Sequence, residues 1–167
     1  MVSVLQAKTL EDYGTARRLI AIMAEWDATE TRARGFPADN LLQQNYSQTP
    51  EQLMAKFSLP GAAMLIAWVD DEPAGCAGFS NSGNNAAEIH KMFVRPQFRR
   101  RGAAHALMTA VLSGMKENGF AEARLETVNF MTEAIALYRS FRFEPCDAFH
   151  DVLEELEDIT VFFRRAV

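Results

Sequence analysis

The N-terminal third of the chain changes between strand-like and helix-like hydrophobic spacing. Val2–Gln6 is mostly apolar, which predicts a short strand. Thr9 then has the position of a helix cap, and the apolar residues within 16–23 recur at intervals of three and four, which predicts an amphipathic helix. A polar stretch with turn residues follows from Trp26 to Asn40. The threonine, proline and glutamine of Thr49–Gln52 predict the start of a second helix.

The rest of the chain predicts a group of three strands and then alternating helices and strands. Met64–Val69 is a nearly continuous apolar run, and turn residues separate it from the strand-like segments Ala74–Ser80 and Ala87–Val94. From Gly102 to Asn118 the apolar residues return to helical spacing, and Gly119 is the expected stop. The remaining predicted elements are a strand at Ala123–Val128, a helix at Met131–Phe141 and a strand at Thr160–Phe163.

This order of elements predicts an α/β fold, with residues 1–167 forming a single domain. The central sheet should be mixed and mostly antiparallel, with helices flanking it. Ala87–Val128 consists of a strand, a helix and a strand, so its two strands should be parallel and joined by a right-handed crossover. Open α/β sheets bind ligands at the carboxyl ends of their strands. We therefore expect a binding site where Ala87–Val94 ends and the next helix begins.

Composition and charge exclude several classes of protein. The formal net charge of -5 argues against a nucleic-acid binder, because such affinity rests largely on phosphate neutralisation by Lys and Arg. No segment approaches the ~20 apolar residues of a membrane helix, and the first residues lack the pattern of a signal peptide. Cys76 and Cys146 have no metal-ligand spacing. We therefore expect a cytoplasmic protein with reduced thiols and no metal, and neither nucleic acid nor membrane as a partner.

An arginine-rich segment lies at the expected binding site. A helix start exposes unpaired N–H groups with a partial positive charge, glycine lets an anion approach the backbone, and arginine donates paired hydrogen bonds to phosphate. The segment combines these features, which favours a pyrophosphate-binding loop. A solvated charge cluster with a helix cap is the alternative interpretation. The candidate ligand-binding residues are Arg99, Arg100, Arg101, Gly102, Ala103 and Ala104.

This segment resembles the acyl-CoA loop of the GCN5-related N-acetyltransferase (GNAT) superfamily, whose signature is Q/R-x-x-G-x-G/A. Arg99, Gly102 and Ala104 occupy its first, fourth and sixth positions. The stretch AEIHKMFVRPQFRRRG is similar to the family's central strand and its exit, LIAWVDDEPAGCAGF to the preceding hairpin, and AIALYRSFRF to the family's A..LY...GF segment. The resemblance covers most of Met64–Pro145. It departs at Arg142, where the family usually has a helix-ending glycine.

The resemblance implies a GNAT-like fold whose parallel strand–helix–strand unit forms the acyl-CoA site. It implies an N-acetyltransferase that uses acetyl-CoA as co-substrate and acetylates a primary amine of a small molecule, an amino acid or a protein. A non-catalytic acyl-CoA-binding regulatory module on the same fold is the alternative. Whether the protein assembles as a homodimer stays open at this point. Glu88 and Tyr138 favour the enzyme, because a sensor would not need both.

Glu88 and Tyr138 are the candidate catalytic residues. Glu88 lies in the place of the family's base glutamate and would accept the proton of the amine. His90 shares a strand face with Glu88, and the ordinary histidine pKa of ~6.5 suits a base, so the choice between the two stays open. Tyr138 matches the family tyrosine that protonates the CoA sulfur. Simple core packing is the alternative interpretation of this tyrosine.

Other positions are assigned to the co-substrate or the acceptor through the same resemblance. In the family, backbone N–H groups of the bulged central strand bind the thioester oxygen. By position these groups belong to Met92, Phe93 or Val94, whose side chains we expect in the core. Asn129 is expected either to bond the pantetheine arm or to cap the following helix. The N-terminal helices and their connection, about Trp26–Gln44, are expected to select the acceptor.

Overall fold

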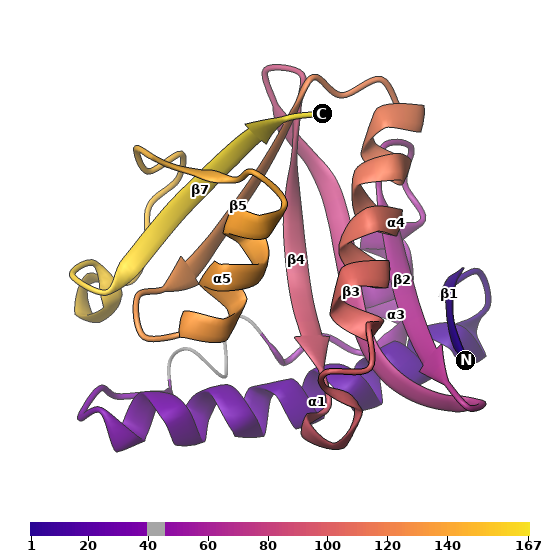
Figure 1. Cartoon of the computed structure of the whole chain (residues 1–167), viewed down its shortest axis with the longest axis horizontal. Coiled ribbons are helices and arrows are strands. Elements are labelled where there is room, and N and C mark those ends of the chain that lie inside the picture. The colour runs from indigo at the N-terminus through magenta and orange to yellow at the C-terminus, as the bar shows by residue number, and fades with distance from the viewer. Residues whose placement is uncertain (40–45) are drawn as a thin grey trace.

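The chain folds around a mixed β-sheet (Figure 1). The computed structural model describes residues 1–39 and 46–167. The strands in this part of the chain are β1 (Val2–Gln6), β2 (Ala63–Val69), β3 (Glu72–Gly83), β4 (Ala86–Val94), β5 (Glu122–Val128), β6 (Glu144–Cys146) and β7 (Thr160–Ala166). They follow the order β1-β2-β3-β4-β5-β7-β6, in which β4 and β5 are parallel and the other neighbours antiparallel. The predicted mixed, mostly antiparallel sheet and its parallel unit are confirmed.

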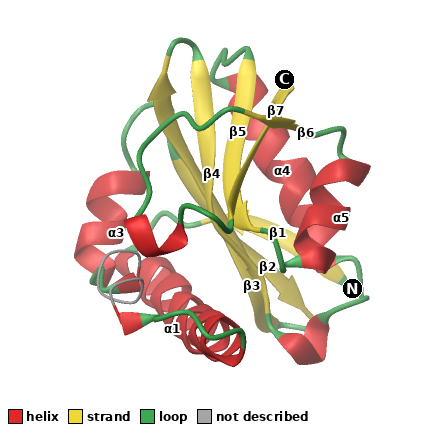
Figure 2. Cartoon of the chain, turned by 90° about the vertical axis from the view of Figure 1, so that its left-hand side faces the viewer, coloured by secondary structure: helices red, strands yellow, loops and turns green. Residues whose placement is uncertain are grey.

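Helices cover both faces of this sheet (Figure 2). The helices of the described residues are α1 (Leu10–Ala33), α3 (Pro50–Phe57), α4 (Ala103–Glu117) and α5 (Thr132–Ser140). On one face α1 and α3 bury residues such as Leu19 and Phe57 against Met64 of the sheet. On the opposite face α4 and α5 bury residues such as Met108 and Tyr138. No helix in this part of the chain combines the length and apolar character that a membrane crossing requires.

Two helix starts follow from the capping residues predicted by the sequence. The Thr9 Oγ1 atom accepts a hydrogen bond from the Asp12 N–H at 3.2 Å, and the Asp12 carboxylate accepts one from the Thr9 N–H at 2.9 Å. Thr49 and Gln52 exchange the same pair of bonds at the start of α3, with Pro50 at the first helical position. Each pair satisfies donors that a helix start otherwise leaves without a partner.

α1 is longer than the sequence pattern predicts. The polar stretch from Trp26 is predicted as a loop, but α1 continues through it to Ala33, so that prediction is wrong for this part. Ala28 and Thr31 are buried, which gives this half of the helix a narrow buried stripe with polar residues around it. Tertiary contacts, such as the hydrogen bond of Asp27 with Tyr46 and the packing of Trp26 on Arg99, therefore stabilise the helix where its own periodicity is weak. Residues 40–44, at the end of the stretch expected to select the acceptor, lie outside the described residues.

Two tight turns set the register of β2, β3 and β4. Asp70 and Asp71 have φ angles of 51° and 66°, and Asn84 and Asn85 have φ angles of 52° and 59°. Paired positive φ angles are typical of the two-residue hairpin turns whose twist matches that of the flanking strands. Asp and Asn tolerate this region better than most residues. The short second turn lets β3 continue beyond its predicted end.

The parallel strands β4 and β5 separate after a few residues. Their pairing joins Ala86–Glu88 to Glu122–Arg124, although β4 continues to Val94 and β5 to Val128. Lys91, with a φ angle of 56°, lies where the register between β3 and β4 shifts as a bulge. Figure 1 shows the two strands diverging toward their C-terminal ends. The gap between them opens at the carboxyl ends, where the sequence predicts a ligand site.

α5 is followed by a left-handed residue that is not glycine. Arg142 has a φ angle of 64°. Its N–H bonds to the Arg139 carbonyl at 2.9 Å, and the Phe143 N–H bonds to the Tyr138 carbonyl at 3.0 Å. A glycine usually occupies this position after a helix. The left-handed conformation costs a residue with a Cβ atom ~1–2 kcal/mol.

We expect Arg142→Gly to raise the free energy of unfolding by about 0.5–1 kcal/mol. Relief of the left-handed strain should exceed the added flexibility of the unfolded chain. Urea denaturation followed by circular dichroism measures the difference. Arg142→Ala is the matched control, because it keeps a Cβ atom and should bring no such gain. A glycine variant less stable than the wild type would show instead that contacts of the arginine side chain outweigh the strain.

Candidate active site

The loop between β4 and α4 presents a row of open backbone donors. Gly102 is the N-cap of α4 with a φ angle of 85°, and a Cβ atom added to it would meet no atom within 4 Å. The Ala106 N–H bonds to the Gly102 carbonyl at 3.0 Å. Among the described residues, no acceptor pairs with the backbone N–H groups from Arg100 to His105. Together with the helix dipole, these donors suit an anionic group.

The three arginines of this loop have different environments. Arg99 donates from Nε to the last carbonyl of β4 at 3.2 Å, and its guanidinium lies 4.6 Å from the centre of the Trp26 ring. Arg101 pairs with the carboxylate of Asp70, which also binds the N-terminal ammonium at 2.7 Å. Arg100 is exposed, and its side chain has no partner in the part of the chain that the structure describes. The guanidinium of Arg100 is therefore available to a phosphate, while Arg99 and Arg101 brace the loop.

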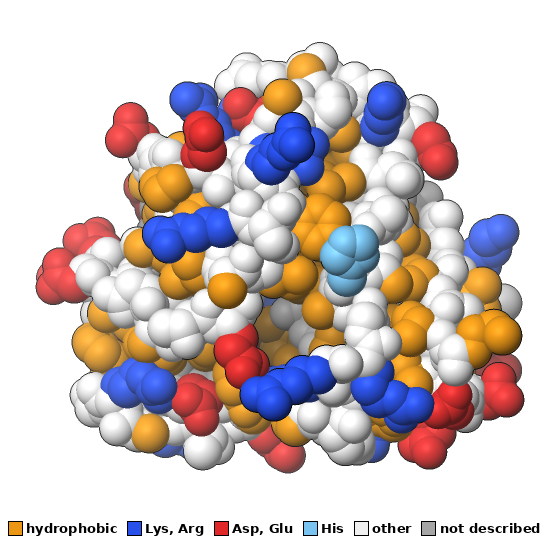
Figure 3. All heavy atoms as spheres, viewed as in Figure 1, with side chains coloured by type: hydrophobic (Ala, Val, Ile, Leu, Met, Phe, Trp, Pro, Cys, Tyr) orange, Lys and Arg blue, Asp and Glu red, His pale blue; other side chains and the backbone are white. Residues whose placement is uncertain are grey.

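The gap between β4 and β5 coincides with a hollow in the molecular surface. Figure 3 shows a recess near the middle of this face, with Lys and Arg side chains along its lower rim. Phe93 and Val94 are buried, and Met92 packs against the core beneath α4 and α5, as predicted for these side chains. Beyond Glu88, β4 pairs with no described strand on the side of β5. The backbone of this stretch therefore remains open to a ligand.

Tyr138 lies on the α4–α5 side of the sheet. The residue is 5% exposed, and its ring packs edge-on against Phe143 with the ring centres 6.1 Å apart. Its hydroxyl has no hydrogen-bond partner among the described residues, yet protein atoms do not fully enclose it. Burial, followed by the charge of Asp27, raises the pKa of Tyr138. The hydroxyl therefore keeps its proton at neutral pH and can donate it in a hydrogen bond.

Glu88 lies where β4 and β5 begin to separate, on the opposite face from Tyr138. Its neighbour Ile89 belongs to the core beneath α4 and α5, so strand alternation turns Glu88 toward the face of α1 and α3. Glu126 of β5 points to the same side, because Leu125 also belongs to that core. The side chain of Glu88 is 14% exposed. The gap therefore has a carboxylate pair on one face and a tyrosine hydroxyl on the other.

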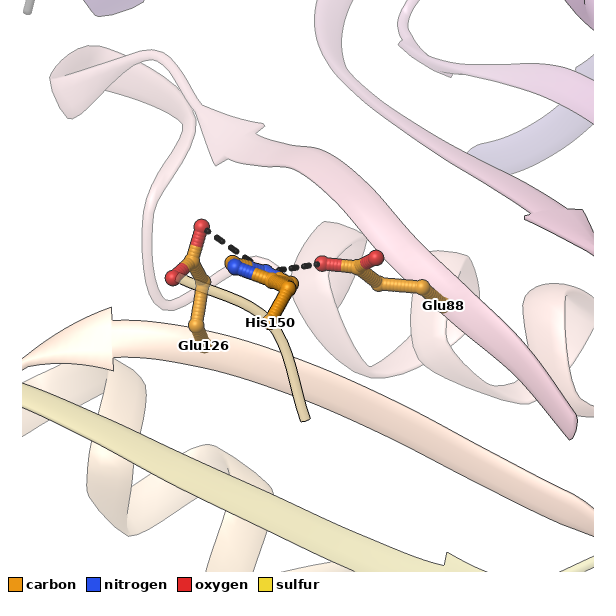
Figure 4. A group of neighbouring side chains, drawn as sticks. All are labelled: Glu88, Glu126 and His150. Atoms are coloured by element: carbon orange, nitrogen blue, oxygen red, sulfur yellow. Dashed lines mark hydrogen bonds and ion pairs between the residues drawn. The ribbon is translucent and has the colours of Figure 1, made fainter. Parts of the chain in front are cut away.

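His150, in the segment between β6 and β7, lies between these two carboxylates (Figure 4). Its Nε2 atom is 3.3 Å from Oε1 of Glu88 and 3.6 Å from Oε1 of Glu126. Burial lowers the pKa of His150, but the Asp151 carbonyl and the two carboxylates outweigh burial, and the net pKa is raised. Burial also raises the pKa of Glu126. The three side chains offer ligand atoms within 4.8 Å of one another, so they could also hold a divalent metal.

His90 has a different environment from Glu88, although both point to the same face. Its Nε2 atom is 2.8 Å from Oγ of Ser80. Burial, followed by the charges of Lys56 and Lys91, lowers the pKa of His90 to about 3. An imidazole with so low a pKa accepts a proton poorly at neutral pH, because the charged form is strongly disfavoured. Its burial and low pKa therefore make His90 a poorer candidate base than Glu88.

A second group of polar side chains, one buried and two half-buried, lies under the bulge of β4. Asp27 of α1 accepts a hydrogen bond from the hydroxyl of Tyr46. The ammonium of Lys91 lies 4.5 Å from the centre of the Tyr46 ring. Burial raises the pKa of Asp27 to about 6 and lowers the pKa of Lys91 to about 8. This group connects the C-terminal half of α1 to the bulged strand.

Asn129 lies at the end of β5 and does not cap α5. The N-cap of α5 is Met131, and no side chain caps this helix. The capping interpretation of Asn129 is therefore wrong. Its N–H bonds to the carbonyl of Ile159 at 2.8 Å, and its side chain is exposed beside the gap.

Asp27, Lys91, Glu126 and His150 were not predicted as site residues from the sequence. They belong to two groups, Asp27 with Lys91 and Glu126 with His150. The members of each group are far apart in the chain and come together only in the packed structure. One usable signal existed for Glu126. Once β4 and β5 are taken as parallel neighbours, the alternation of apolar residues in each strand turns Glu88 and Glu126 to the same face.

Comparison with known proteins identifies the family. The family model described as Acetyltransferase (GNAT) family matches residues 20–143. YjgM of Escherichia coli (strain K12), an uncharacterized N-acetyltransferase, is 30% identical over 148 residues, which are 86% of this chain and 83% of that protein. The crystal structure of PaiA N-acetyltransferase from Thermoplasma acidophilum in complex with coenzyme A has a TM-score of 0.74 at 16% identity, over 100% of this chain and 99% of that one. A GNAT-family acetyltransferase from Staphylococcus aureus Mu50 has a TM-score of 0.74 at 16% identity, over 99% of each chain.

The fold and the family match define an acetyltransferase enzyme built on one α/β domain. The chain belongs to the acetyltransferase (GNAT) family. The fold class and the family resemblance predicted from the sequence are both confirmed.

Proposed function

We propose that this enzyme uses acetyl-CoA and transfers the acetyl group to a primary amine of a small molecule, an amino acid or a protein. The observation that carries this proposal is the arrangement of Glu88 and Tyr138 on opposite faces of the sheet at the gap between β4 and β5. An amine that attacks a thioester in the gap approaches from one face, and the sulfur leaves toward the other. A base on the first face and a proton donor on the second support both proton movements of the reaction.

The loop before α4 is the proposed site for the pyrophosphate of CoA. The open N–H groups from Arg100 to His105 and the absence of a side chain at Gly102 support this site. Ala103 is buried and Ala104 has only a methyl side chain, so neither side chain extends into the loop. CoA bound to PaiA, a protein of the same fold, supports the choice of ligand.

The edge of β4 along the gap is the proposed site for the rest of the co-substrate. Backbone N–H groups of Met92, Phe93 or Val94 are the proposed donors to the thioester oxygen, where negative charge develops during attack. The open edge of β4 beside the bulge supports this assignment. The exposed side chain of Asn129 is the proposed contact for the pantetheine arm.

Acetyl-CoA supplies the acetyl group as a thioester, which an amine can attack only in its neutral form. An alkyl amine has a pKa of ~10.4, so at pH 7 roughly one molecule in a few thousand is neutral. We therefore assign Glu88 the role of accepting the proton of the amine, directly or through a water molecule. Tyr138 is assigned the role of donating a proton to the sulfur as it leaves. The carboxylates of Glu88 and Glu126 favour a cationic acceptor.

Excess acetyl-CoA should raise the melting temperature of the wild type, because a ligand at about 100 times its Kd stabilises the native state by ~2.7 kcal/mol. Gly102→Asp should abolish this shift, since its carboxylate would enter the open space at the N-cap and repel phosphate. Differential scanning fluorimetry measures the melting-temperature shift of both proteins. Gly102→Asn is the matched control, because it has a similar shape without the charge and should retain part of the shift. Equal shifts in the wild type and Gly102→Asp would exclude this loop as the pyrophosphate site.

A thiol-release assay with acetyl-CoA and a panel of amines tests the proposal as a whole. We expect thiol release that requires both the protein and an amine, with the acetylated amine detected by mass spectrometry. The panel should include alkyl amines, amino acids and peptides, because the described residues do not distinguish among them. Stabilisation by acetyl-CoA without thiol release from any amine would instead support a non-catalytic acyl-CoA-binding module.

A further inference from the structure

The contacts of His150 require a hydrogen on each nitrogen of its ring. Nδ1 lies 2.8 Å from the carbonyl oxygen of Asp151, which can only accept, so Nδ1 carries a hydrogen. Nε2 faces the carboxylate oxygens of Glu88 and Glu126 at 3.3 and 3.6 Å, and ionised carboxylates also only accept. Both nitrogens donate only in the protonated imidazolium form. The ring is therefore a cation between two anions.

Three separate elements bring this group together, as Figure 4 shows. Glu88 comes from β4, Glu126 from β5 and His150 from the segment between β6 and β7. Glu126 lies beyond the last residue of β5 that pairs with β4. The rings of Phe149 and Phe162 pack edge-on against the His150 ring, with centres 5.1 and 5.4 Å away. The imidazolium thus links the two strands just where their backbones have separated.

The other charged groups near His150 do not remove its positive charge. The guanidinium of Arg124 lies over the Phe149 ring, 5.5 Å from its centre. Lys56 interacts with the charge of Glu88, and His90 is neutral at ordinary pH because its pKa is about 3. The two cations oppose protonation of His150, but the carboxylates are in direct contact with it. The net pKa of His150 is raised, so the imidazolium persists to a higher pH than in free histidine.

We propose that His150 is a positioning residue for Glu88: held between Glu88 and Glu126, it fixes the Glu88 carboxylate at the start of the gap. This inference rests on the proposed role of Glu88 as the base. Without His150, the two carboxylates would face each other with no cation between them and would repel each other. His150 itself exchanges no proton with the acceptor and acts through Glu88.

A split between kcat and the binding of acetyl-CoA in His150 variants tests this proposal. His150→Gln removes the cation that lies between the two carboxylates. It should lower kcat about tenfold, because a base that is no longer held in place accepts the proton less efficiently. The melting-temperature shift on acetyl-CoA addition should stay unchanged. His150→Lys restores a cation and should recover part of kcat.

A double-mutant cycle and a spectroscopic measurement separate this role from simple packing. If His150 acts through Glu88, adding His150→Gln to Glu88→Gln should change kcat no further. If the His150 ring only packs the segment after β6, His150→Gln should lower kcat by the same factor in the wild type and in Glu88→Gln. Nitrogen NMR of the His150 ring should find both nitrogens protonated at neutral pH. Asp147→Asn, at an exposed position of the same segment, is the control and should leave kcat unchanged.

The outcomes distinguish failure of this inference from failure of the proposed function. An unchanged kcat in His150→Gln, with an acidic limb that still depends on Glu88, would overturn the role of His150 alone. An acidic limb that survives in Glu88→Gln would overturn the base assignment and this inference with it. The assays contain a chelator, because the three ligand atoms could hold a divalent metal. A gain of activity with Zn²⁺ that requires His150 would also overturn the proposal.

Discussion

Tyr138→Phe should lower kcat by roughly 10²–10⁴, which is the usual contribution of a positioned proton donor. The substitution removes only the hydroxyl, and the ring keeps its packing against Phe143 and Phe163. The hydroxyl has no hydrogen-bond partner among the described residues, so its removal leaves none of their polar groups unpaired. Binding of acetyl-CoA should therefore change little. Steady-state kinetics with thiol detection, together with the melting-temperature shift on acetyl-CoA addition, measure the two effects separately.

The raised pKa of Tyr138 determines how this proton is expected to move. A thiol has an ordinary pKa of ~8.5 and a tyrosine of ~10, and burial raises the pKa of Tyr138 further. Transfer of the proton to the thiolate is therefore uphill, so we expect it to proceed along a hydrogen bond that strengthens as the sulfur gains charge. Tyr13→Phe, the same change in a buried tyrosine of α1, is the matched control and should leave kcat unchanged. A kcat of Tyr138→Phe within twofold of the wild type would show that the thiolate leaves unaided or is protonated by water.

Glu88→Gln should depress kcat/KM at neutral pH by roughly 10²-fold or more, because it preserves the size of the side chain and removes its basicity. In the wild type, activity should rise with pH along a limb that reports ionisation of the base. That limb should disappear in the variant. Activity should recover partly at high pH, where a larger fraction of the amine is already neutral. A pH–rate profile from about pH 5 to 10 measures both features.

His90→Gln is the paired control for this prediction. Because the pKa of His90 is about 3, the ring is neutral throughout the assay range and should contribute no limb to the profile. If His90→Gln shows the defect and the recovery while Glu88→Gln behaves like the wild type, His90 is the base. If neither variant changes the profile, the acceptor binds in its neutral form. Orientation and backbone donors would then account for catalysis.

Much of the fold could be predicted because its signals are local in the chain. Thr9 and Thr49 start helices through bonds to residues three positions away, and Gly119 ends α4 with a φ angle of 80°. The loop Arg99–Ala104 joins two consecutive elements, so its residues lie together in any fold that contains this unit. α1 beyond Trp26 could not be predicted in the same way, because the segments that bury its narrow stripe are distant in the chain.

The candidate site shows the same division between local and distant signals. The sequence alone determined the order of elements apart from β6, the parallel strand–helix–strand unit, the loop before α4 and the resemblance to the family. Only the tertiary structure decided which arginine of the loop is available, because Arg99 and Arg101 contact residues distant in the chain. It also decided where β4 and β5 stop pairing and which side chains meet there.

The group of Glu88, Glu126 and His150 depends entirely on that tertiary arrangement. The three residues come from two strands and from the segment after β6, and no spacing in the chain relates them. The choice of Glu88 over His90 has the same origin. Two polar residues on one strand face look equivalent in a sequence, but burial lowers the pKa of His90 to about 3. Burial and charge contact are properties of the packed molecule, because each depends on which distant segments exclude water from a side chain or bring a charge to it.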